Sequence, residues 1–103
     1  MEPPGEGATG MLAAKIAYTN QCGTRAAVDY PATVFSYAES TFAGAASLTY
    51  QLTDFVAKCP DSQIVLLGIS QGAHIIGDCL CGGGGMPRLG PETPPIAKEI
   101  GDH

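Results

Sequence analysis

The chain is poor in cations. It carries five Lys and Arg against ten Asp and Glu, which gives a formal net charge of −5. A surface that binds nucleic acid needs clustered positive side chains to neutralise phosphates, and the sequence has no such cluster. Anionic membrane surfaces attract basic segments for the same reason. We therefore expect neither nucleic acid nor a membrane surface as a partner.

Long apolar runs and large aromatic side chains are also scarce. The most hydrophobic run, residues 64–67, is a strand's length and far short of the roughly 20 apolar residues of a membrane span. Met1 is followed by Glu2, Pro3 and Pro4, so no signal peptide is visible. There is no Trp, and core or loop packing accounts for the four Tyr and three Phe.

The four cysteines leave the redox state open. Three disulfide pairings are possible, and none of the spacings matches a zinc knuckle or a redox CxxC motif; the cysteines are Cys22, Cys59, Cys79 and Cys81. Secreted disulfide chemistry and buried free thiols are both compatible with this pattern. We expect no metal site.

The order of predicted elements indicates an α/β fold. Apolar spacing and turn residues predict helices over 6–18, 42–58 and 71–80, and strands over 25–30 and 63–68. Residues 31–40 read as irregular, and a short helix is possible over 96–100. The apolar strand 63–68 has the pattern of one buried on both faces of a parallel sheet.

The length of 103 residues allows one domain at most. We expect residues 1–103 to form a single incomplete domain, with residues 86–103, which hold four prolines, as a poorly ordered tail. A short parallel sheet would leave unpaired edges, and such edges favour oligomers or aggregates.

The strongest chemical signal is Gly68-Ile69-Ser70-Gln71-Gly72, between the apolar strand and the following helix. In such a turn a strained backbone lifts the serine hydroxyl above the sheet, and the flanking glycines let strand and helix approach closely. The new helix directs its free N–H groups toward developing negative charge. We predict Ser70 as a nucleophile and the backbone N–H of Gln71 as an oxyanion donor. The alternative is a structural turn that holds a serine by coincidence.

Several segments resemble the cutinase and acetylxylan esterase family of α/β-hydrolases. These are residues 59–61 with 64–73, 75–78, 80–84, 2–5 and 29–32. The run Leu80-Cys81-Gly82-Gly83-Gly84 leans toward the acetylxylan esterase branch. The resemblance implies a partial α/β-hydrolase three-layer sandwich with a short parallel sheet. It also implies a secreted serine esterase that needs no cofactor and acts on simple esters, such as those of acetylated xylan or cutin.

The same resemblance implies departures at both ends. The family has an earlier strand and oxyanion loop, a cysteine partner for Cys59 near its N-terminus, and a triad Asp and His well after the elbow. We therefore expect a chain truncated at both ends, without a complete triad. His74 lies on the helix that follows Ser70, four residues after it, and we expect it to be an ordinary surface histidine. We expect Asp78 to be a solvated helix residue. Adjacent Asp102 and His103 are poorly suited to form a triad pair.

Three hypotheses follow. The first is a serine esterase fragment with impaired or absent activity. The second is a working minimal esterase that recruits His103 or a second chain as base, which ester turnover lost in Ser70→Ala would favour. The third is a non-catalytic module that binds polysaccharide or a partner, which an aromatic platform would favour.

Overall fold

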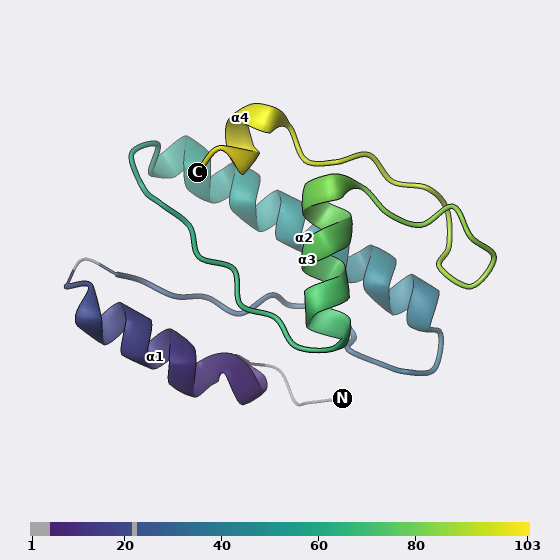
Figure 1. Cartoon of the computed structure of the whole chain (residues 1–103), viewed down its shortest axis with the longest axis horizontal. Helices are drawn as coiled ribbons and strands as arrows, with labels where there is room; N and C mark the ends of the chain where they lie inside the picture. The colour runs from purple at the N-terminus through teal and green to yellow at the C-terminus, as the bar shows by residue number, and fades with distance from the viewer. Residues whose placement is uncertain (1–4, 22) are drawn as a thin grey trace.

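Two crossing helices, α2 (Tyr37–Lys58) and α3 (Gln71–Cys81), organise the molecule, as the computed structural model in Figure 1 shows. The structure describes residues 5–21 and 23–103. The other helical elements are a 3-10 turn, η1 (Gly7–Thr9), then α1 (Gly10–Thr19) and the short α4 (Lys98–Gly101). The predicted helix over 71–80 is thus confirmed to within one residue, whereas the predicted helix over 6–18 starts as a 3-10 turn and is α-helical over Gly10–Thr19.

The core lies where α2 and α3 cross. Its buried members are Leu48 and Leu52 from α2 and Ile75 and Cys79 from α3. Partly buried apolar side chains from the extended segments, α3 and the C-terminal region surround them: Val28, Tyr30, Ile64, Leu66, Ile76, Ile96 and Ile100. The burial of these groups removes apolar surface from water and is the main force that holds the segments together.

Helix α2 begins earlier than its sequence predicts. The apolar stripe indicated a start at Phe42, with residues 31–40 irregular, but the helix already begins at Tyr37. Ser36 has a left-handed backbone with φ of 57°, which ends the preceding loop, and Glu39 lies in the first turn, where a negative charge is favourable. Phe42 is 47% exposed, whereas Ala45, three residues along the predicted stripe, is buried.

Gly44 allows the two helices to cross closely. A Cβ at this position would overlap the Ile75 side chain and lie 3.1 Å from the Tyr30 ring. The packing of the crossing therefore depends on the absence of a side chain at this point of α2.

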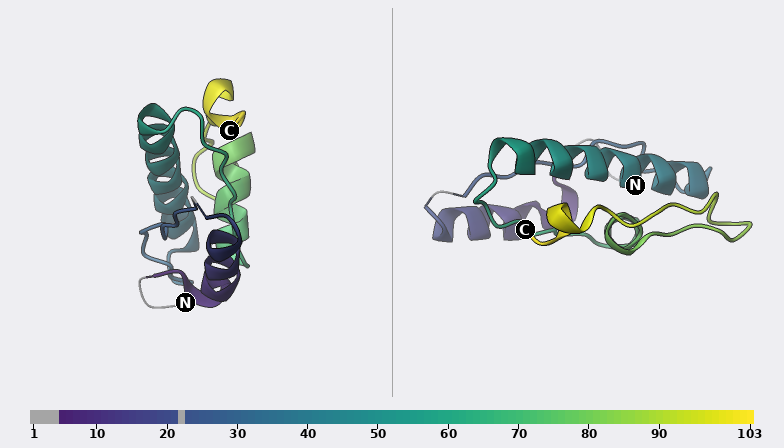
Figure 2. Two further views of the ribbon diagram at one scale, coloured as in Figure 1. Left: turned by 90° about the vertical axis from the view of Figure 1, so that its left-hand side faces the viewer. Right: turned by 90° about the horizontal axis from the view of Figure 1, so that it is seen from above.

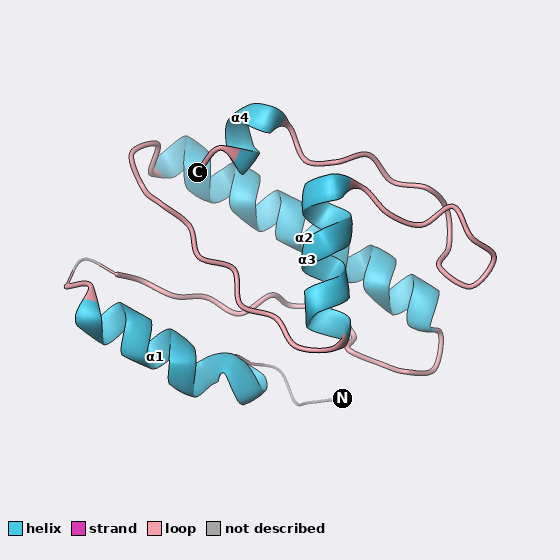
Figure 3. Ribbon diagram, viewed as in Figure 1, coloured by secondary structure: helices cyan, strands magenta, loops and turns pink. Residues whose placement is uncertain are grey.

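The predicted α/β architecture was wrong. Within the described residues no strand forms, and the one β-bridge is an isolated antiparallel pair, Gly83 with Thr93 (Figure 3). Residues 25–30 and 63–68 are extended, but the parallel sheet and the three-layer sandwich that they were expected to build are absent from this part of the chain.

The physical reason lies in the apolar run 63–68. Ile64 and Leu66 pack against the core, whereas Val65 is 63% exposed, so the run is buried on one face and not on both. The N–H of Ile64 donates to the carbonyl of His103, at 2.9 Å, and not to a neighbouring strand. An extended segment becomes a strand only where a second one is in register beside it. Without a sheet in the described residues, the predicted open sheet edges have no counterpart there either.

The elements form two thin layers. Viewed from above, α2 lies on one side, and α1, α3 and α4 lie on the other (Figure 2, right). The Cα positions extend 44 × 30 × 16 Å, so the molecule is two elements thick. Helix α1 has no buried residue, and its Met11 and Tyr18 are 88% and 90% exposed. The small core follows from this flat arrangement.

Two sequence predictions concern cysteines and membranes. Cys59, Cys79 and Cys81 are free, so no disulfide bond joins any two of them, and Cys22 lies outside the described residues. Cys79 is buried and its Sγ lies 3.2 Å from the Thr49 hydroxyl, which fits the alternative of a buried thiol. None of the helices in the described part combines the length and apolarity that a membrane span requires.

Candidate active site

Ser70 stands at the junction between the extended segment 63–69 and α3. Its backbone has φ of 53° and ψ of −119°, a conformation that a non-glycine residue adopts only at a cost of about 1–3 kcal/mol. Three non-glycine residues with positive φ occur among those described: Ala32, Ser36 and Ser70. Ser36 has the φ and ψ of a left-handed helical residue. Ser70 shares the positive φ, but its ψ lies outside that region.

The hydroxyl of Ser70 is not used for helix capping. A serine just before a helix ordinarily accepts a hydrogen bond from an N–H of the first turn. Ser70 makes no such side-chain bond, and the residue is exposed. The backbone conformation thus presents an exposed hydroxyl beside the start of α3, which is the local geometry of a strained elbow.

Gly68 is needed for the elbow to close. A Cβ at Gly68 would lie 2.7 Å from the carbonyl carbon of Gly72 and 2.8 Å from the amide nitrogen of Ala73. Both are backbone atoms of the first turn of α3, which cannot rotate away. Gly72 differs, because a Cβ there would meet no atom within 4 Å. The close approach of the backbone before Ser70 to the first turn of α3 therefore explains why position 68 is a glycine, but it does not explain Gly72.

The first turn of α3 supplies N–H groups near Ser70. Gln71 is the first helical residue, and the first four N–H groups of a helix have no partner within it. The N–H of Gly72 donates to the carbonyl of Ile69, at 2.9 Å, which tightens the turn itself. The aligned peptide dipoles give this end of α3 a partial positive charge.

A second loop is bonded to the elbow. The side-chain Nε2 of Gln71 donates to the carbonyl of Thr33, at 3.1 Å, and the Thr33 N–H donates to the Ser40 hydroxyl of α2, at 3.2 Å. The loop contains Ala32 and Ser36, the other two non-glycine residues with positive φ. The strained positions of the described chain thus belong to two connected turns.

His74 does not face Ser70 with a free ring nitrogen. Its Nδ1 lies 3.0 Å from the Tyr37 hydroxyl, its Nε2 lies 3.4 Å from Oδ2 of Asp78, and its ring stacks on Tyr37 at a centroid distance of 5.8 Å. Because both nitrogens are engaged, the geometry gives no support to His74 as a base. Asp78 is not the solvated residue that the sequence indicated, because its side chain is 16% exposed and paired with His74.

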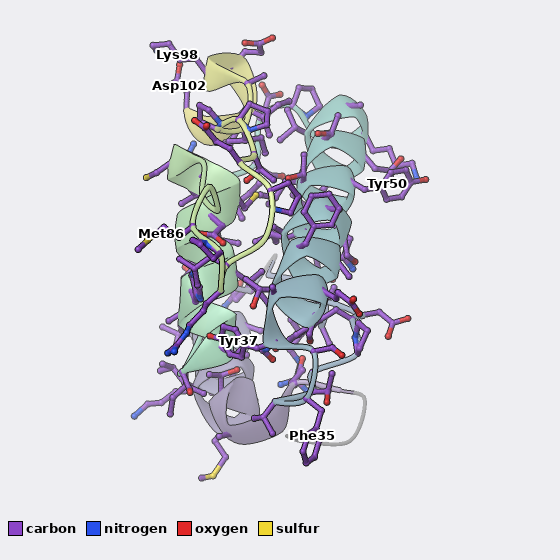
Figure 4. The ribbon with its side chains drawn as sticks, turned by 90° about the vertical axis from the view of Figure 1, so that its right-hand side faces the viewer. Phe35, Tyr37, Tyr50, Met86, Lys98 and Asp102 are labelled. Atoms are coloured by element: carbon purple, nitrogen blue, oxygen red, sulfur yellow. The ribbon has the colours of Figure 1, made fainter. Side chains whose placement is uncertain are left out.

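Asp102 and His103 lie at the other end of the segment that leads to Ser70. Asp102 accepts from Lys98 at 2.7 Å, and Figure 4 places this pair at the opposite end of the molecule from Tyr37. His103 Nδ1 lies 3.0 Å from the carbonyl of Ser62, just before the extended segment begins. Neither side chain is brought to Ser70.

Tyr37 is the residue of this region that the sequence did not reveal. Residues 31–40 read as irregular, so nothing placed Tyr37 on a helix facing α3. A start of α2 at Tyr37 would have put its side chain on the same stripe as Thr41, Gly44, Ala45 and Leu48, which are all buried. The apolar and small-residue spacing thus pointed to Tyr37, but the predicted helix began at Phe42 and left Tyr37 outside it.

Comparison with known proteins gives a family for the chain. The family model for Cutinase matches residues 1–100. The chain belongs to the cutinase family. It is 35% identical to Cutinase 11 of Verticillium dahliae over 88 residues, which cover 79% of the chain and 30% of that protein. No solved structure matches the chain.

Two further relatives are acetylxylan esterases. The chain is 33% identical to acetylxylan esterase 2 of Talaromyces purpureogenus over 88 residues, or 79% of the chain and 38% of that enzyme. It is 47% identical to the acetylxylan esterase of Hypocrea jecorina over 49 residues, or 48% of the chain and 16% of that enzyme. The matches thus cover between 16% and 38% of the length of these relatives.

Proposed function

We propose that this cutinase-family chain carries the nucleophile elbow of a carboxylic ester hydrolase, with Ser70 as nucleophile and the backbone N–H of Gln71 as an oxyanion donor. The observation that carries the proposal is the backbone of Ser70, held at φ of 53° and ψ of −119° with a hydroxyl that does not cap α3. A strained serine at the junction between an extended segment and a helix N-terminus has the local geometry of the nucleophile elbow in serine esterases.

In this proposal the Ser70 oxygen attacks the ester carbonyl and gives its proton to a base, and the carbonyl oxygen gains negative charge beside the start of α3. The tetrahedral intermediate then expels the alcohol, and water attacks the acyl-serine to release the acid and restore Ser70. The Gln71 N–H and the positive end of the helix stabilise that charge, and one such donor is typically worth about 3–4 kcal/mol in the transition state. Neither His74 nor His103 is arranged as the base, so the proposal assigns a nucleophile and one donor to this chain and leaves the base unassigned.

The relatives indicate the substrate class. Two of them are named acetylxylan esterases and one a cutinase, so we propose acetyl esters of xylan or cutin-type esters as substrates, and secretion as the location. Hydrolysis of an ester by an activated serine needs no cofactor.

The test is ester hydrolysis by the purified chain and two serine variants. p-Nitrophenyl acetate and acetylated xylan serve as substrates, and acetate or p-nitrophenol release is measured. Ser36→Ala is the matched control, because Ser36 is also exposed, has positive φ and precedes a helix. Because no base is assigned to this chain, we expect slow turnover that Ser36→Ala retains and Ser70→Ala loses; turnover that persists in Ser70→Ala would contradict the assignment. A folded chain without turnover on either ester would fit an esterase fragment without activity or a non-catalytic module that binds polysaccharide or a partner.

A further inference from the structure

Three polar side chains connect the first turns of α2 and α3 beside the elbow. Tyr37 comes from the first turn of α2, and His74 and Asp78 come from α3, one turn apart. The Tyr37 oxygen lies 3.0 Å from His74 Nδ1, and His74 Nε2 lies 3.4 Å from Asp78 Oδ2. We call these three side chains the Tyr37–His74–Asp78 link.

One hydrogen bond joins these groups, between the Tyr37 hydroxyl and His74 Nδ1 at 3.0 Å. The Nε2 of His74 lies 3.4 Å from Asp78 Oδ2, an ion-pair contact, and a carboxylate at that distance favours the form of His74 with a hydrogen on Nε2. In the neutral form of that kind, Nδ1 accepts from the Tyr37 hydroxyl. The side chains of His74 and Asp78 are 29% and 16% exposed, so water screens their contact less than it screens a surface ion pair.

We propose that Tyr37 and His74 are positioning residues that hold the Ser70 elbow in place against α2. This inference rests on the proposed function, in which Ser70 is the nucleophile. The backbone N–H of His74 donates to the carbonyl of Ser70, at 3.2 Å, which is the first i to i+4 bond of α3. The residue whose ring contacts Tyr37 therefore also joins Ser70 to the first turn of the helix.

A second bond acts on the other side of the same turn. Gln71, next to Ser70, donates through Nε2 to the carbonyl of Thr33, in the loop that leads into Tyr37. The elbow is thus tied to the start of α2 through its loop and through the helix itself. A nucleophile has to be held within a few tenths of an ångström of its productive position, and such supporting contacts provide this.

The test compares Tyr37→Phe with Tyr50→Phe by NMR. Tyr37→Phe keeps the ring that stacks on His74 and removes the hydroxyl alone. Tyr50 is on the same helix, is 73% exposed and points away from α3, so it is the matched control (Figure 4). Hydrogen exchange of the His74 amide reports the bond to Ser70, and the ¹⁵N shifts of the His74 ring report which nitrogen carries the hydrogen.

We expect Tyr37→Phe to speed exchange of the His74 amide by roughly threefold to tenfold, the effect of one lost hydrogen bond, and to reduce the share of the Nε2–H form. Tyr50→Phe should change neither. If the two variants have the same His74 exchange and the same ring shifts, the link does not hold the elbow and the inference is overturned.

A rate measurement separates this inference from the proposed function. The rate at which a fluorophosphonate labels Ser70 should fall in Tyr37→Phe, and should be unchanged in Tyr50→Phe. A Ser70 labelling rate that Tyr37→Phe leaves unchanged would overturn the positioning role. If the parent chain does not label at Ser70, the proposed function fails, whereas exchange and ring shifts still decide whether the link holds the elbow.

Asp78 provides a second pair of variants if Tyr37→Phe does not fold. Asp78→Asn retains an oxygen that faces His74 Nε2, and Asp78→Ala does not. We expect Asp78→Ala to speed exchange of the His74 amide severalfold and Asp78→Asn to restore most of the protection. Equal exchange in both variants would contradict the link.

Discussion

Gly68 offers a sharp test of how the elbow is built. In Gly68→Ala the new methyl carbon would lie 2.7 Å from the Gly72 carbonyl carbon and 2.8 Å from the Ala73 nitrogen. Both atoms belong to the backbone of α3, so the helix has to move away from segment 63–69. The third close atom, Cδ1 of Ile76 at 2.7 Å, is the end of a flexible side chain and can rotate away. The cost is therefore set by the two backbone contacts.

The magnitude follows from these contacts. Inserting a methyl group into a packed site typically costs about 1–3 kcal/mol. For a domain of this size each kcal/mol corresponds to roughly 4–8 °C in melting temperature. We expect Gly68→Ala to melt at least about 5 °C lower than the parent chain, as measured by far-UV circular dichroism with heat and with urea.

The same helix holds two matched controls. A Cβ at Gly72 or Gly77 would meet no atom within 4 Å, and both glycines are helical. Their replacement by Ala should leave stability unchanged or raise it by about 0.5–1 kcal/mol, because Ala loses less backbone entropy on folding. A Gly68→Ala variant as stable as Gly77→Ala would refute the close approach of segment 63–69 to α3.

Three further predictions concern the core. Gly44→Ala should destabilise by about 1–3 kcal/mol in urea unfolding, because its methyl group would overlap Ile75 in the crossing; no loss would contradict the close packing. Thr41→Val should raise the free energy of unfolding by about 1 kcal/mol in the same assay, since the Thr41 hydroxyl is buried without a partner in the described structure. Thr53→Val is the control, because it removes an exposed hydroxyl that is already hydrogen-bonded, and it should not raise stability. A thiol reagent should modify exposed Cys81 at least about tenfold faster than buried Cys79, as read by peptide mass; equal rates would mean that the core is open.

Local features of the fold could be predicted from the sequence with fair accuracy. Gly68 to Gly72 correctly marked the junction at which α3 begins, and the glycines after Cys81 correctly marked its end. The glycine run after Cys81 is a local signal, because four consecutive glycines cost too much backbone entropy to remain helical. The core residues Leu48, Leu52 and Ile75 also lie within the helices that apolar spacing predicted.

The sheet could not be predicted because it depends on partners distant in sequence. The run Ile64 to Leu67 has the composition of a buried strand, but composition does not supply a neighbour in register. In the structure Val65 is exposed, and the N–H of Ile64 is bonded to His103 at the C-terminal end. The same limit applies to the link between Tyr37 and His74, which are 37 positions apart and meet only because α2 and α3 cross.

The prediction of Ser70 as nucleophile is supported by the strained backbone and uncapped helix but is still a proposal about chemistry. The geometry explains why the first glycine of the motif has to lack a side chain. What the described residues do not provide is a histidine turned toward Ser70 with a free ring nitrogen.

The most direct test of the central claim is covalent labelling of the purified, folded chain with a fluorophosphonate, followed by intact mass and peptide mapping. Ser70→Ala and Ser36→Ala serve as the matched pair. We predict a single adduct on the peptide that contains Ser70, which Ser36→Ala retains and Ser70→Ala loses. An adduct on another residue, or no adduct on a chain shown to be folded, would contradict the assignment of Ser70 as an activated nucleophile.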